Sequence, residues 1–571
     1  MSALDVPEDG TALLLTDCRL IDGAGNPWVR ADILVEGDRI AAIAPPGVLG
    51  GRRRRRPPAV VDAGGRYVTP GFIDPHTHSD LTVLSCPDAE SAVRQGVTTH
   101  IIGNCGMSAA PVADEHLADQ STNWEIYFAR TEDWPWRSFA EYLAAIDATG
   151  CGINVGALVG HSTLRLAAMG YEQRRATRSE LNVMKRLLRE SLAAGAFGLS
   201  TGLVYPPGCY ADTDELRELV AVVAEYRGIY TSHVRGERET ILEAVAEALG
   251  LAEEHDVPVE VSHNAPKWGG PPAGENLALI ETARARGLDA TLDNDTHTDL
   301  APRLSRALPQ WLLELGPDAL SDVLRDRDTR DRLRREIAAD DRPAPGYAGL
   351  LKHGRFDRVF ILTATDESLL GKSVAAVAAG RGADPLDTYF DLIVENRDAI
   401  VGIFDYVPEE NIRAVLVHPL SMVSSDGLIL PLPESDADVA YWPCSYGEYT
   451  GVLERYVRDE PVLRLEECIR KMTSAPAQRF GLWDRGLLRP GLRADLIVFD
   501  LERVHDRATN LYPHSYPFEN IPPRHSEGID HVLVNGQPVV WDGEHTGRRP
   551  GRVLRAPGKR VRRASRAGVR R

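Results

Sequence analysis

Short apolar segments that alternate with helical segments are the feature that most constrains how this chain can fold. The clearest apolar segments are residues 153–158, 228–232, 258–262 and 359–363. Residues 178–193 instead show the apolar period of an amphipathic helix. Strands separated by helices form βα units, because parallel neighbours need a crossover connection between them. From residue 67 onward, the sequence therefore predicts an α/β fold with either a parallel barrel or a doubly wound sheet.

The two ends of the chain have a different pattern, with strand-like segments broken by Gly and Pro. These segments are residues 12–16, 32–36, 39–44, 495–500 and 531–540. Glu36-Gly37-Asp38 and Asn535-Gly536 are turn signals typical of β-hairpins. We expect the two ends to form one small β-sandwich domain.

A charged helical stretch at residues 318–341 interrupts the βα pattern and predicts an inserted helical subdomain. The arginine run at residues 52–56 is interpreted as a solvated loop. The expected domains are residues 1–69 for the first part of the sandwich, 70–480 for the barrel with an insertion at about 300–350, 481–547 for the second part of the sandwich, and 548–571 for a basic tail that we expect to be disordered.

Net charge and apolar content exclude several classes of protein. The 571 residues carry a formal charge of −18, and residues 548–571 contribute eleven positive and no negative charges, which leaves −29 for residues 1–547. An acidic body of this kind is not expected to bind nucleic acid, although the basic tail keeps that role open as an alternative. No apolar run approaches the ~20 residues of a membrane-spanning helix, so no membrane partner is expected.

The N-terminus and the cysteines indicate a reducing compartment. The opening MSALDVPEDG lacks the regions of a signal peptide. The seven cysteines are an odd number without paired spacing, which is not typical of a disulfide framework. We expect a cytoplasmic protein, either a monomer or a homo-oligomer, in which a specialised cysteine is a ligand or a nucleophile.

The strongest functional signal is the His-x-His of His76 and His78, which follows an apolar strand in VTPGFIDPHTHSD. Side chains at positions i and i+2 share one face, and neutral imidazole is a good zinc ligand. An isolated pair of this kind is more often two surface histidines. The flanking strand, the Gly71 turn and Asp80 favour metal binding here.

Three further residues follow predicted strands. His233 lies in TSHVRGE, His263 in VSHN and Cys105 in IIGNCG. Each alone is more often structural, and a lone buried cysteine is usually a core thiol. Because barrel active sites form at the carboxyl ends of strands, these residues together with the His-x-His predict a metal cluster.

Asp426 lies in MVSSDG, after a predicted strand at residues 414–417 and a loop. A carboxylate beside a metal-activated water can accept its proton and later return it to a leaving group. An ordinary Asp-Gly turn explains the same residues equally well. Only the ensemble of candidate residues favours catalysis.

That ensemble resembles the amidohydrolase superfamily, and within it the N-acyl-D-amino-acid deacylase (D-aminoacylase) family. The resemblance runs from about residue 13 to residue 555. It is carried by PGFIDPHTHSD from Pro70, GNCG from Gly103, FGLSTGLVYPPG from Phe197, SHVRGE from Ser232, SHNAPK from Ser262, SSDG from Ser424 and RPGLRADLIVFD from Arg489.

The resemblance implies a metal-dependent (β/α)8 TIM-like barrel with a flanking β-sandwich and one or two Zn²⁺ ions. It assigns Cys105, His233 and His263 to the catalytic zinc and His76 and His78 to a second metal position, which Cys105 can bridge. Many superfamily members bridge their metals with a carboxylated lysine, but the run FGLSTG from Phe197 has none. That absence favours the cysteine.

The resemblance also implies a mechanism and some substrate contacts. Asp426 accepts the proton of the attacking water and then protonates the departing amine. His161, in GHSTLR, matches a family segment, and both a substrate contact and a structural role are open for it.

Substrate recognition is where the sequence departs from the family. Cys444 and Gly451 replace two arginines, the second of which binds the substrate carboxylate in relatives, and neither residue can supply a guanidinium. Asp293-Asn294-Asp295-Thr296 stands where many relatives have Tyr-Pro-Tyr-Thr. Arg235 or Lys267 could bind the carboxylate instead, although an internal ion pair is an equal alternative for such an arginine.

The sequence therefore predicts a zinc-dependent amidohydrolase that acts on a small N-acylated compound, with N-acyl-D-amino acids as the leading substrate class. One alternative is an amidohydrolase for a carboxylate-free amide, a cyclic amide or a urea-type compound. A second alternative, from another class, is a non-catalytic protein that binds a ligand at the metal site.

Overall fold

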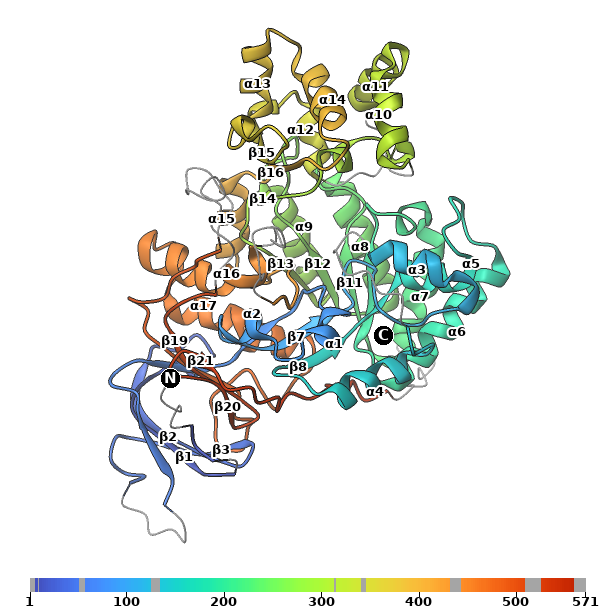
Figure 1. Ribbon diagram of the computed structural model, residues 1–571. Helices are drawn as coiled ribbons and strands as arrows, with labels where there is room; N and C mark the ends of the chain where they lie inside the picture. The colour runs from blue at the N-terminus through green and yellow to red at the C-terminus, as the bar shows by residue number, and fades with distance from the viewer. Residues whose placement is uncertain are drawn as a thin grey trace.

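The computed structural model describes residues 6–8, 10–50, 57–124, 134–312, 315–339, 346–431, 443–508 and 525–558. Figure 1 shows three regions: a β-sheet that holds the N-terminal strands, a central barrel with surrounding helices, and an insertion at the opposite end of the molecule. The arginine run at residues 52–56 lies outside the described residues.

The first region is a nine-stranded sheet built from both chain ends. β18 (Leu496–Phe499) pairs antiparallel with β5 (Tyr67–Pro70), which places C-terminal and N-terminal strands side by side. The other strands are β1 (Leu13–Leu20), β2 (Val29–Glu36), β3 (Arg39–Ala44), β4 (Ala59–Asp62), β19 (Ile529–Val534), β20 (Gln537–Trp541) and β21 (Glu544–His545). Leu13, Ile33 and Leu496 share one hydrophobic cluster. The expectation of a β domain made by both ends is confirmed, with hydrogen bonding continuous through one sheet.

Both predicted hairpin turns are present. Gly37 has φ +60° in the turn between the paired residues Glu36 and Arg39. Asn535 and Gly536 have φ +47° and +78° between β19 and β20. Left-handed residues at a two-residue turn match the right-handed twist of the strands, which is why Asn-Gly is favoured there.

The central region contains two parallel sheets, one of six strands in the order β17-β13-β12-β11-β10-β9 and one of three in the order β6-β7-β8. Their bounds are β6 (Phe72–Asp74), β7 (Val97–Ile102), β8 (Asn154–Ala157), β9 (Val159–Gly160), β10 (Gly198–Gly202), β11 (Ile229–His233), β12 (Val259–Ser262), β13 (Ala290–Asn294) and β17 (Ser421–Val423). Leu158 alone separates β8 from β9, and a parallel bridge joins Thr77 to Gly427 on the other side. The strands therefore enclose a common interior, as a barrel requires.

Helices cover the outside of these strands. α6 (Arg178–Ala194) begins with a capping box between Thr177 and Glu180, and it buries Leu181, Met184 and Leu188 at helical spacing. The other covering helices include α4 (Phe139–Thr149), α5 (His161–Met169), α7 (Thr213–Tyr226), α8 (Ile241–His255), α9 (Ala273–Ala285) and α15 (Glu409–Val417). Residues of these helices and of the strands form the largest hydrophobic cluster.

One segment predicted as a barrel strand is helical. Residues 414–417 are the last turn of α15, and the strand that precedes Asp426 is the shorter β17. Ile412, Val415 and Leu416 are buried on one face of that helix. Because strand and helix can both present a short apolar run, the run at its end could not distinguish them.

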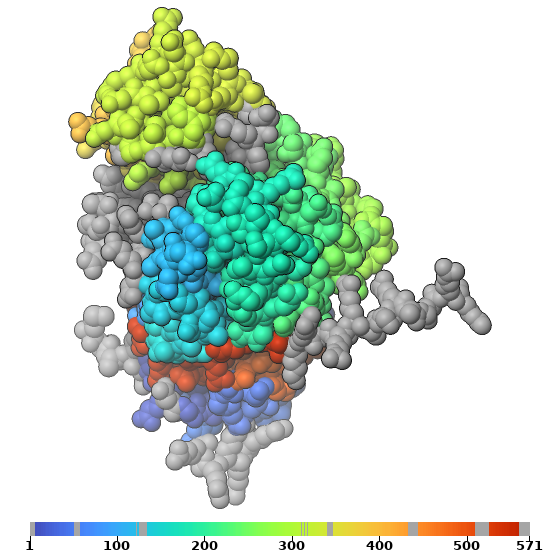
Figure 2. Space-filling model, turned by 90° about the vertical axis from the view of Figure 1, so that its right-hand side faces the viewer, coloured from blue at the N-terminus to red at the C-terminus, as the bar shows by residue number. Residues whose placement is uncertain are grey.

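The third region is an insertion with its own core. β14 (Asp299–Leu300), β15 (Val359–Thr363) and β16 (Val401–Asp405) form a three-stranded antiparallel sheet. The helices around it are α10 (Pro317–Arg325), α11 (Arg327–Ala339), α12 (Gly349–Lys352), α13 (Val374–Arg381) and α14 (Pro385–Glu395), and they share a separate hydrophobic cluster. Figure 2 shows this region projecting from the barrel.

The insertion differs from its prediction in two ways. It reaches from β14 to β16, well past residue 350, and residues 359–363 belong to its antiparallel sheet and not to the barrel. The predicted charged helix at residues 318–341 is present as the two helices α10 and α11. β15 is apolar like a barrel strand, and only its pairing with a strand about 40 residues later assigns it to the insertion.

Residues 548–558, which we call the C-terminal strap, correct the prediction of a disordered tail from residue 548. The strap runs beside the start of β8, with a parallel bridge between Val553 and Val155. The amide of Leu554 donates to the carbonyl of Val155 at 2.7 Å, and that of Ala556 donates to Gly195 at 2.9 Å. In Figure 2 the red C-terminal residues fill the seam between the N-terminal strands and the barrel. The remaining residues, 559–571, lie outside the described residues.

Three arginines of the strap each face an aspartate. These pairs are Arg549–Asp88 at 2.7 Å, Arg552–Asp38 at 3.0 Å and Arg555–Asp147 at 2.5 Å. Composition alone indicated disorder because these acceptors are distant in sequence.

Among the described residues, no helix combines the length and apolarity needed to cross a membrane.

Candidate metal centre and active site

The candidate site residues converge at the carboxyl ends of the barrel strands. His76 and His78 follow β6, Cys105 follows β7, and His233 is the last residue of β11. His263 follows β12 directly, and Asp426 comes three residues after β17. This is the end of a barrel at which active sites are built, because the loops there bring together residues from many strands.

The Cys105 thiol lies at the centre of a cluster of imidazoles. Its Sγ is 3.2 Å from Nε2 of His76, 3.3 Å from Nε2 of His263 and 3.4 Å from Nδ1 of His233. Cys105 is 3% exposed. Three ring nitrogens that point at one buried sulfur form a compact set of soft donors.

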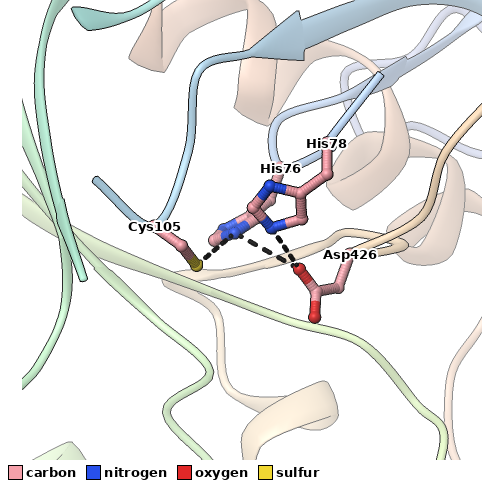
Figure 3. Close-up of side chains that lie close together, drawn as sticks. All are labelled: His76, His78, Cys105 and Asp426. Atoms are coloured by element: carbon pink, nitrogen blue, oxygen red, sulfur yellow. Dashed lines mark hydrogen bonds and ion pairs between the residues drawn. The ribbon is translucent and has the colours of Figure 1, made fainter. Parts of the chain in front are cut away.

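The Asp426 carboxylate approaches the same cluster from the opposite side (Figure 3). Its Oδ1 is 2.9 Å from Nε2 of His78, 3.5 Å from Nε2 of His76 and 3.8 Å from Nε2 of His263. One carboxylate oxygen thus faces three of the histidines.

The donors fall into two groups that could each hold a metal ion. One group is Cys105, His233 and His263, and the other is His76, His78, Cys105 and Asp426; within each, the donor atoms lie within 4.8 Å of one another. Thiolate and imidazole are preferred ligands of Zn²⁺. The residues therefore fit a zinc centre, and Cys105 belongs to both groups.

The electrostatic interactions in the cluster favour an ionised Cys105 thiol and an ionised Asp426 carboxylate. Burial raises the pKa of the Cys105 thiol, but the imidazoles of His76 and His263 outweigh burial and hold its pKa well below its ordinary value. Burial also raises the pKa of Asp426, and His263 and His78 outweigh it, so that its pKa is lowered. A thiolate can ligate metal and a carboxylate can accept a proton.

Carboxylates behind the histidines were missed by sequence reasoning as functional groups. Asp293 Oδ1 lies 3.1 Å from Nδ1 of His76, and Glu237 Oε1 lies 3.4 Å from Nε2 of His233. Asp295 Oδ1 lies 3.6 Å from Nδ1 of His263. Such pairs orient a ligating imidazole and raise its basicity. The available signal was an acidic residue at or just after a strand end, which ordinary turns also produce.

Three site residues have a left-handed backbone. The φ angles are +47° at Cys105, +52° at His263 and +52° at Asp426. This conformation costs a non-glycine residue on the order of 1 kcal/mol or more, and such strain is concentrated at functional sites. Here it turns each side chain into the cluster within three residues of a strand end.

Arg235, a candidate for binding a substrate carboxylate, forms an internal ion pair. Its Nε lies 3.1 Å and its Nη2 3.3 Å from the carboxylate of Glu247. The ion-pair alternative considered for this arginine is the arrangement that the structure contains.

Lys267 is close to the site and also engaged. It is 2% exposed, and its Nζ lies 3.8 Å from Oε1 of Glu237 and 5.3 Å from the ring centre of Tyr406. The amide of Gly346, from the insertion, donates to the other oxygen of Glu237 at 2.7 Å. Glu237 therefore connects a histidine of the cluster, this lysine and the insertion.

His161 is fully buried and does not join the cluster. Its Nε2 lies 2.7 Å from Oε1 of Glu215, and Arg165 donates to both oxygens of the same carboxylate. This arrangement fits the structural role that the sequence left open.

The two positions that lack arginine lie on α16 (Cys444–Gly451). Cys444 is 7% exposed. The carboxylate of Asp506 lies against Gly447 and Gly451, so close that a Cβ at Gly447 would be 1.8 Å from its Oδ1. On the same helix, Oε2 of Glu448 is 2.6 Å from Nδ1 of His297. An acidic group thus occupies the space beside position 451.

Comparison with known proteins identifies relatives over nearly the whole chain. The model of the Amidohydrolase family matches residues 59–540. A D-aminoacylase of Alcaligenes xylosoxydans xylosoxydans is 35% identical over 95% of this chain and 97% of its own. An N-acyl-D-glutamate deacylase of the same organism is 35% identical over 94% of this chain and 95% of its own.

Solved structures agree with these relatives. The N-acyl-D-glutamate deacylase of Bordetella bronchiseptica, complexed with zinc and a phosphonate inhibitor that mimics the tetrahedral intermediate, has a TM-score of 0.72 and 33% identity. The match covers 95% of this chain and 99% of that one. A D-aminoacylase crystal structure, described as defining a novel subset of amidohydrolases, also has a TM-score of 0.72, with 32% identity over the same shares.

Proposed function

Because the chain belongs to the Amidohydrolase family, we propose that it is a zinc-dependent hydrolase of the amide bond in small N-acylated compounds. N-acyl-D-amino acids, which the names of its relatives specify, are the leading substrate class. The observation that carries the proposal is the convergence of Cys105, His233 and His263 beside the carboxylate of Asp426.

We assign one zinc position to Cys105, His233 and His263, and a second to His76 and His78 with Cys105 shared between them. The donor set of thiolate and imidazole supports this assignment, as does the zinc named in the deacylase complex. When bound, zinc acidifies a water molecule and polarises an acyl carbonyl.

Asp426 is the proposed general base and acid. Its carboxylate accepts a proton from the attacking water as the new C–O bond forms at the acyl carbon. It then donates that proton to the amide nitrogen as the C–N bond breaks, which releases a carboxylate and a free amine. The lowered pKa of Asp426 supports the first step, because the group is ionised at neutral pH.

A second candidate function is hydrolysis of an amide that has no free carboxylate, including cyclic amides and urea-type compounds. The observation that favours it is that Arg235 and Lys267 each face a carboxylate of the protein. His161 faces Glu215 in the same way. A substrate that binds any of these three residues has to displace its internal partner.

The proposal includes a cytoplasmic location and a small-molecule substrate without a nucleic-acid or membrane partner. All seven cysteines are free, as expected in a reducing compartment. The acidic charge of −29 over residues 1–547 supports the absence of nucleic acid. The proposal also includes the predicted domain boundaries that the sheets do not define. It includes either a monomer or a homo-oligomer as the assembly.

The proposed function is tested by measuring amine release from N-acetyl-D- and N-acetyl-L-amino acids and their carboxylate-free analogues with zinc-loaded protein. Asp426→Asn should lower kcat by about 10³-fold while the zinc content stays unchanged. Near wild-type activity in this variant would show that another group moves the proton. Bound zinc without turnover of any amide would favour the non-catalytic alternative.

A further inference from the structure

We propose that Asp295 is a specificity-determining residue, which makes the site favour amides whose amine part carries a neutral or cationic hydrogen-bond donor over those with a free carboxylate. The inference rests on the proposed amide hydrolysis and, within it, favours the second candidate function, the carboxylate-free amides, over the N-acyl-D-amino acids. The inference follows from the exposure of the side chains around the metal cluster and from the charges that the exposed ones carry.

The accessible side of the cluster is lined by carboxylates. The side chains of His76, His78 and His263 are 1%, 0% and 6% exposed. Those of Asp426 and Asp295, which contact the same histidines, are 30% and 15% exposed. The more exposed groups of the site are therefore two carboxylates, and a substrate that approaches from their side meets both of them.

Asp295 lies beside the metal cluster and is partly exposed there. It comes directly after β13, and one of its carboxylate oxygens lies 3.6 Å from Nδ1 of His263. In the part of the chain that the structure describes, no lysine or arginine forms an ion pair with it. Within the described ranges, the negative charge of Asp295 is therefore matched only by an imidazole of the metal cluster.

Three cationic groups near the site each face a carboxylate already. Lys267 faces Glu237 at 3.8 Å, and Arg235 faces Glu247 at 3.1 Å. His297, two residues after Asp295, faces Glu448 at 2.6 Å. A substrate carboxylate would have to compete with an internal partner for any of them.

Two neighbouring groups show the same excess of negative charge. Burial raises the pKa of the Tyr406 hydroxyl well above its ordinary value, and Asp295 and Glu237 raise it further. Burial likewise raises the pKa of the Cys444 thiol, and Asp426 and Glu448 add to the effect. Neither Tyr406 nor Cys444 is one of the proposed metal ligands.

Charge selection follows from this arrangement. A carboxylate close to Asp295 in a partly buried site meets a like charge that water screens poorly. An amide N–H or an ammonium group in the same place donates a hydrogen bond to a charged acceptor, which is stronger than a neutral hydrogen bond. Removing the charge of Asp295 should therefore weaken the discrimination.

The test uses three substrates that differ in one group. They are N-acetyl-D-leucine, its carboxamide N-acetyl-D-leucinamide, and the analogue in which an aminomethyl group replaces the carboxylate. Release of acetate by zinc-loaded protein gives kcat/KM for each. We expect the carboxamide and the ammonium compound to exceed the carboxylate by about tenfold or more.

Asp295→Asn should reduce the ratio of kcat/KM for the ammonium compound to that for the carboxylate by about tenfold. The ratio cancels any general loss of activity from a displaced His263, and zinc content is measured on the same samples. Asp318→Asn removes an equal charge from the exposed start of α10, and it should leave the ratio unchanged.

The outcomes separate this inference from the proposed function. Faster turnover of the carboxylate by the wild type, or an unchanged ratio in zinc-loaded Asp295→Asn, would overturn the charge preference and leave amide hydrolysis standing. Acetate released from none of the three compounds would overturn the proposed function, and the inference with it.

Discussion

At the scale of single residues, the site depends on negative charges held among imidazoles. The Cys105 thiol and the Asp426 carboxylate both have lowered pKa values because histidines face them. Behind the histidines, Asp293 and Glu237 supply further negative charge. Carboxylate–histidine–metal arrangements fix the ring orientation, so the positions of these acids matter as much as those of the ligands.

The pair of His297 and Glu448 gives a pH-dependent contribution to stability. Burial lowers the pKa of His297, but Glu448 outweighs it and raises the pKa from its ordinary 6.5 to about 9. The folded protein therefore holds this proton more tightly than the unfolded chain does. The resulting stabilisation is fully present below pH 6.5 and is lost as the pH rises through about 9.

His297→Gln tests this contribution. The difference in the free energy of unfolding between wild type and variant should shrink by about 2 kcal/mol between pH 6.5 and 9, as measured by denaturant unfolding at several pH values. His353→Gln, at a partly exposed histidine that faces Glu239, is the matched control for the loss of an imidazole that faces a carboxylate. A pH-independent difference for His297→Gln would contradict the assignment.

At the scale of elements, the position of a side chain relative to a strand end decides its role. The ligands follow β6, β7 and β12, and His233 ends β11, so parallel strands alone bring them to one edge. The C-terminal strap works at the other end of the barrel, where it adds backbone hydrogen bonds to the start of β8.

Two truncations distinguish the strap from the basic residues that follow it. Removing residues 548–571 should lower stability by about 3–5 kcal/mol, because the strap's backbone hydrogen bonds and the buried Val553 are lost. Removing residues 559–571 alone should leave the melting temperature nearly unchanged. Equal melting temperatures for the two truncated proteins would show that the strap contributes nothing.

Salt is a further control for the same experiment. The three arginines of the strap that face aspartates are 39–49% exposed, and exposed ion pairs contribute little in water. High salt should therefore lower the melting temperature of the wild type much less than loss of the strap does.

At the scale of the whole molecule, the metal centre joins parts that are otherwise separate. Its donors come from both parallel sheets, and Glu237 connects it to the insertion through the amide of Gly346. Without a bound metal ion, the buried Cys105 thiolate and the histidine imidazoles have no common ion to bind. Binding of zinc to the folded state alone must therefore stabilise the whole barrel.

Chelator-treated protein should show a higher melting temperature when zinc is restored. At free zinc of about 1,000 times Kd the gain is about 4 kcal/mol, measured by thermal unfolding with and without zinc. Cys105→Ala should lose most of this gain, because its thiol belongs to both donor groups.

Cys468→Ala removes a different buried thiol and should keep the response to zinc, even if its starting melting temperature is lower. A full zinc response in Cys105→Ala would return Cys105 to the role of a core thiol.

The sequence by itself determined the features that depend on near neighbours in the chain. Alternating strands and helices predicted the barrel, and His76, His78 and Cys105 could be placed at strand ends because each follows an apolar run. The hairpin turns were predictable for the same reason, since the left-handed conformation favours Gly and Asn locally.

Only the tertiary structure decided the features that depend on distant partners. Residues 359–363 look like a barrel strand until they pair with β16, and the strap looks disordered until its arginines meet Asp38, Asp88 and Asp147. Arg235 looks available for a substrate until Glu247 occupies it. The local sequence pattern indicates only the propensity of a segment. The free energy of pairing depends on which group lies opposite that segment, and only folding brings the opposite group into place.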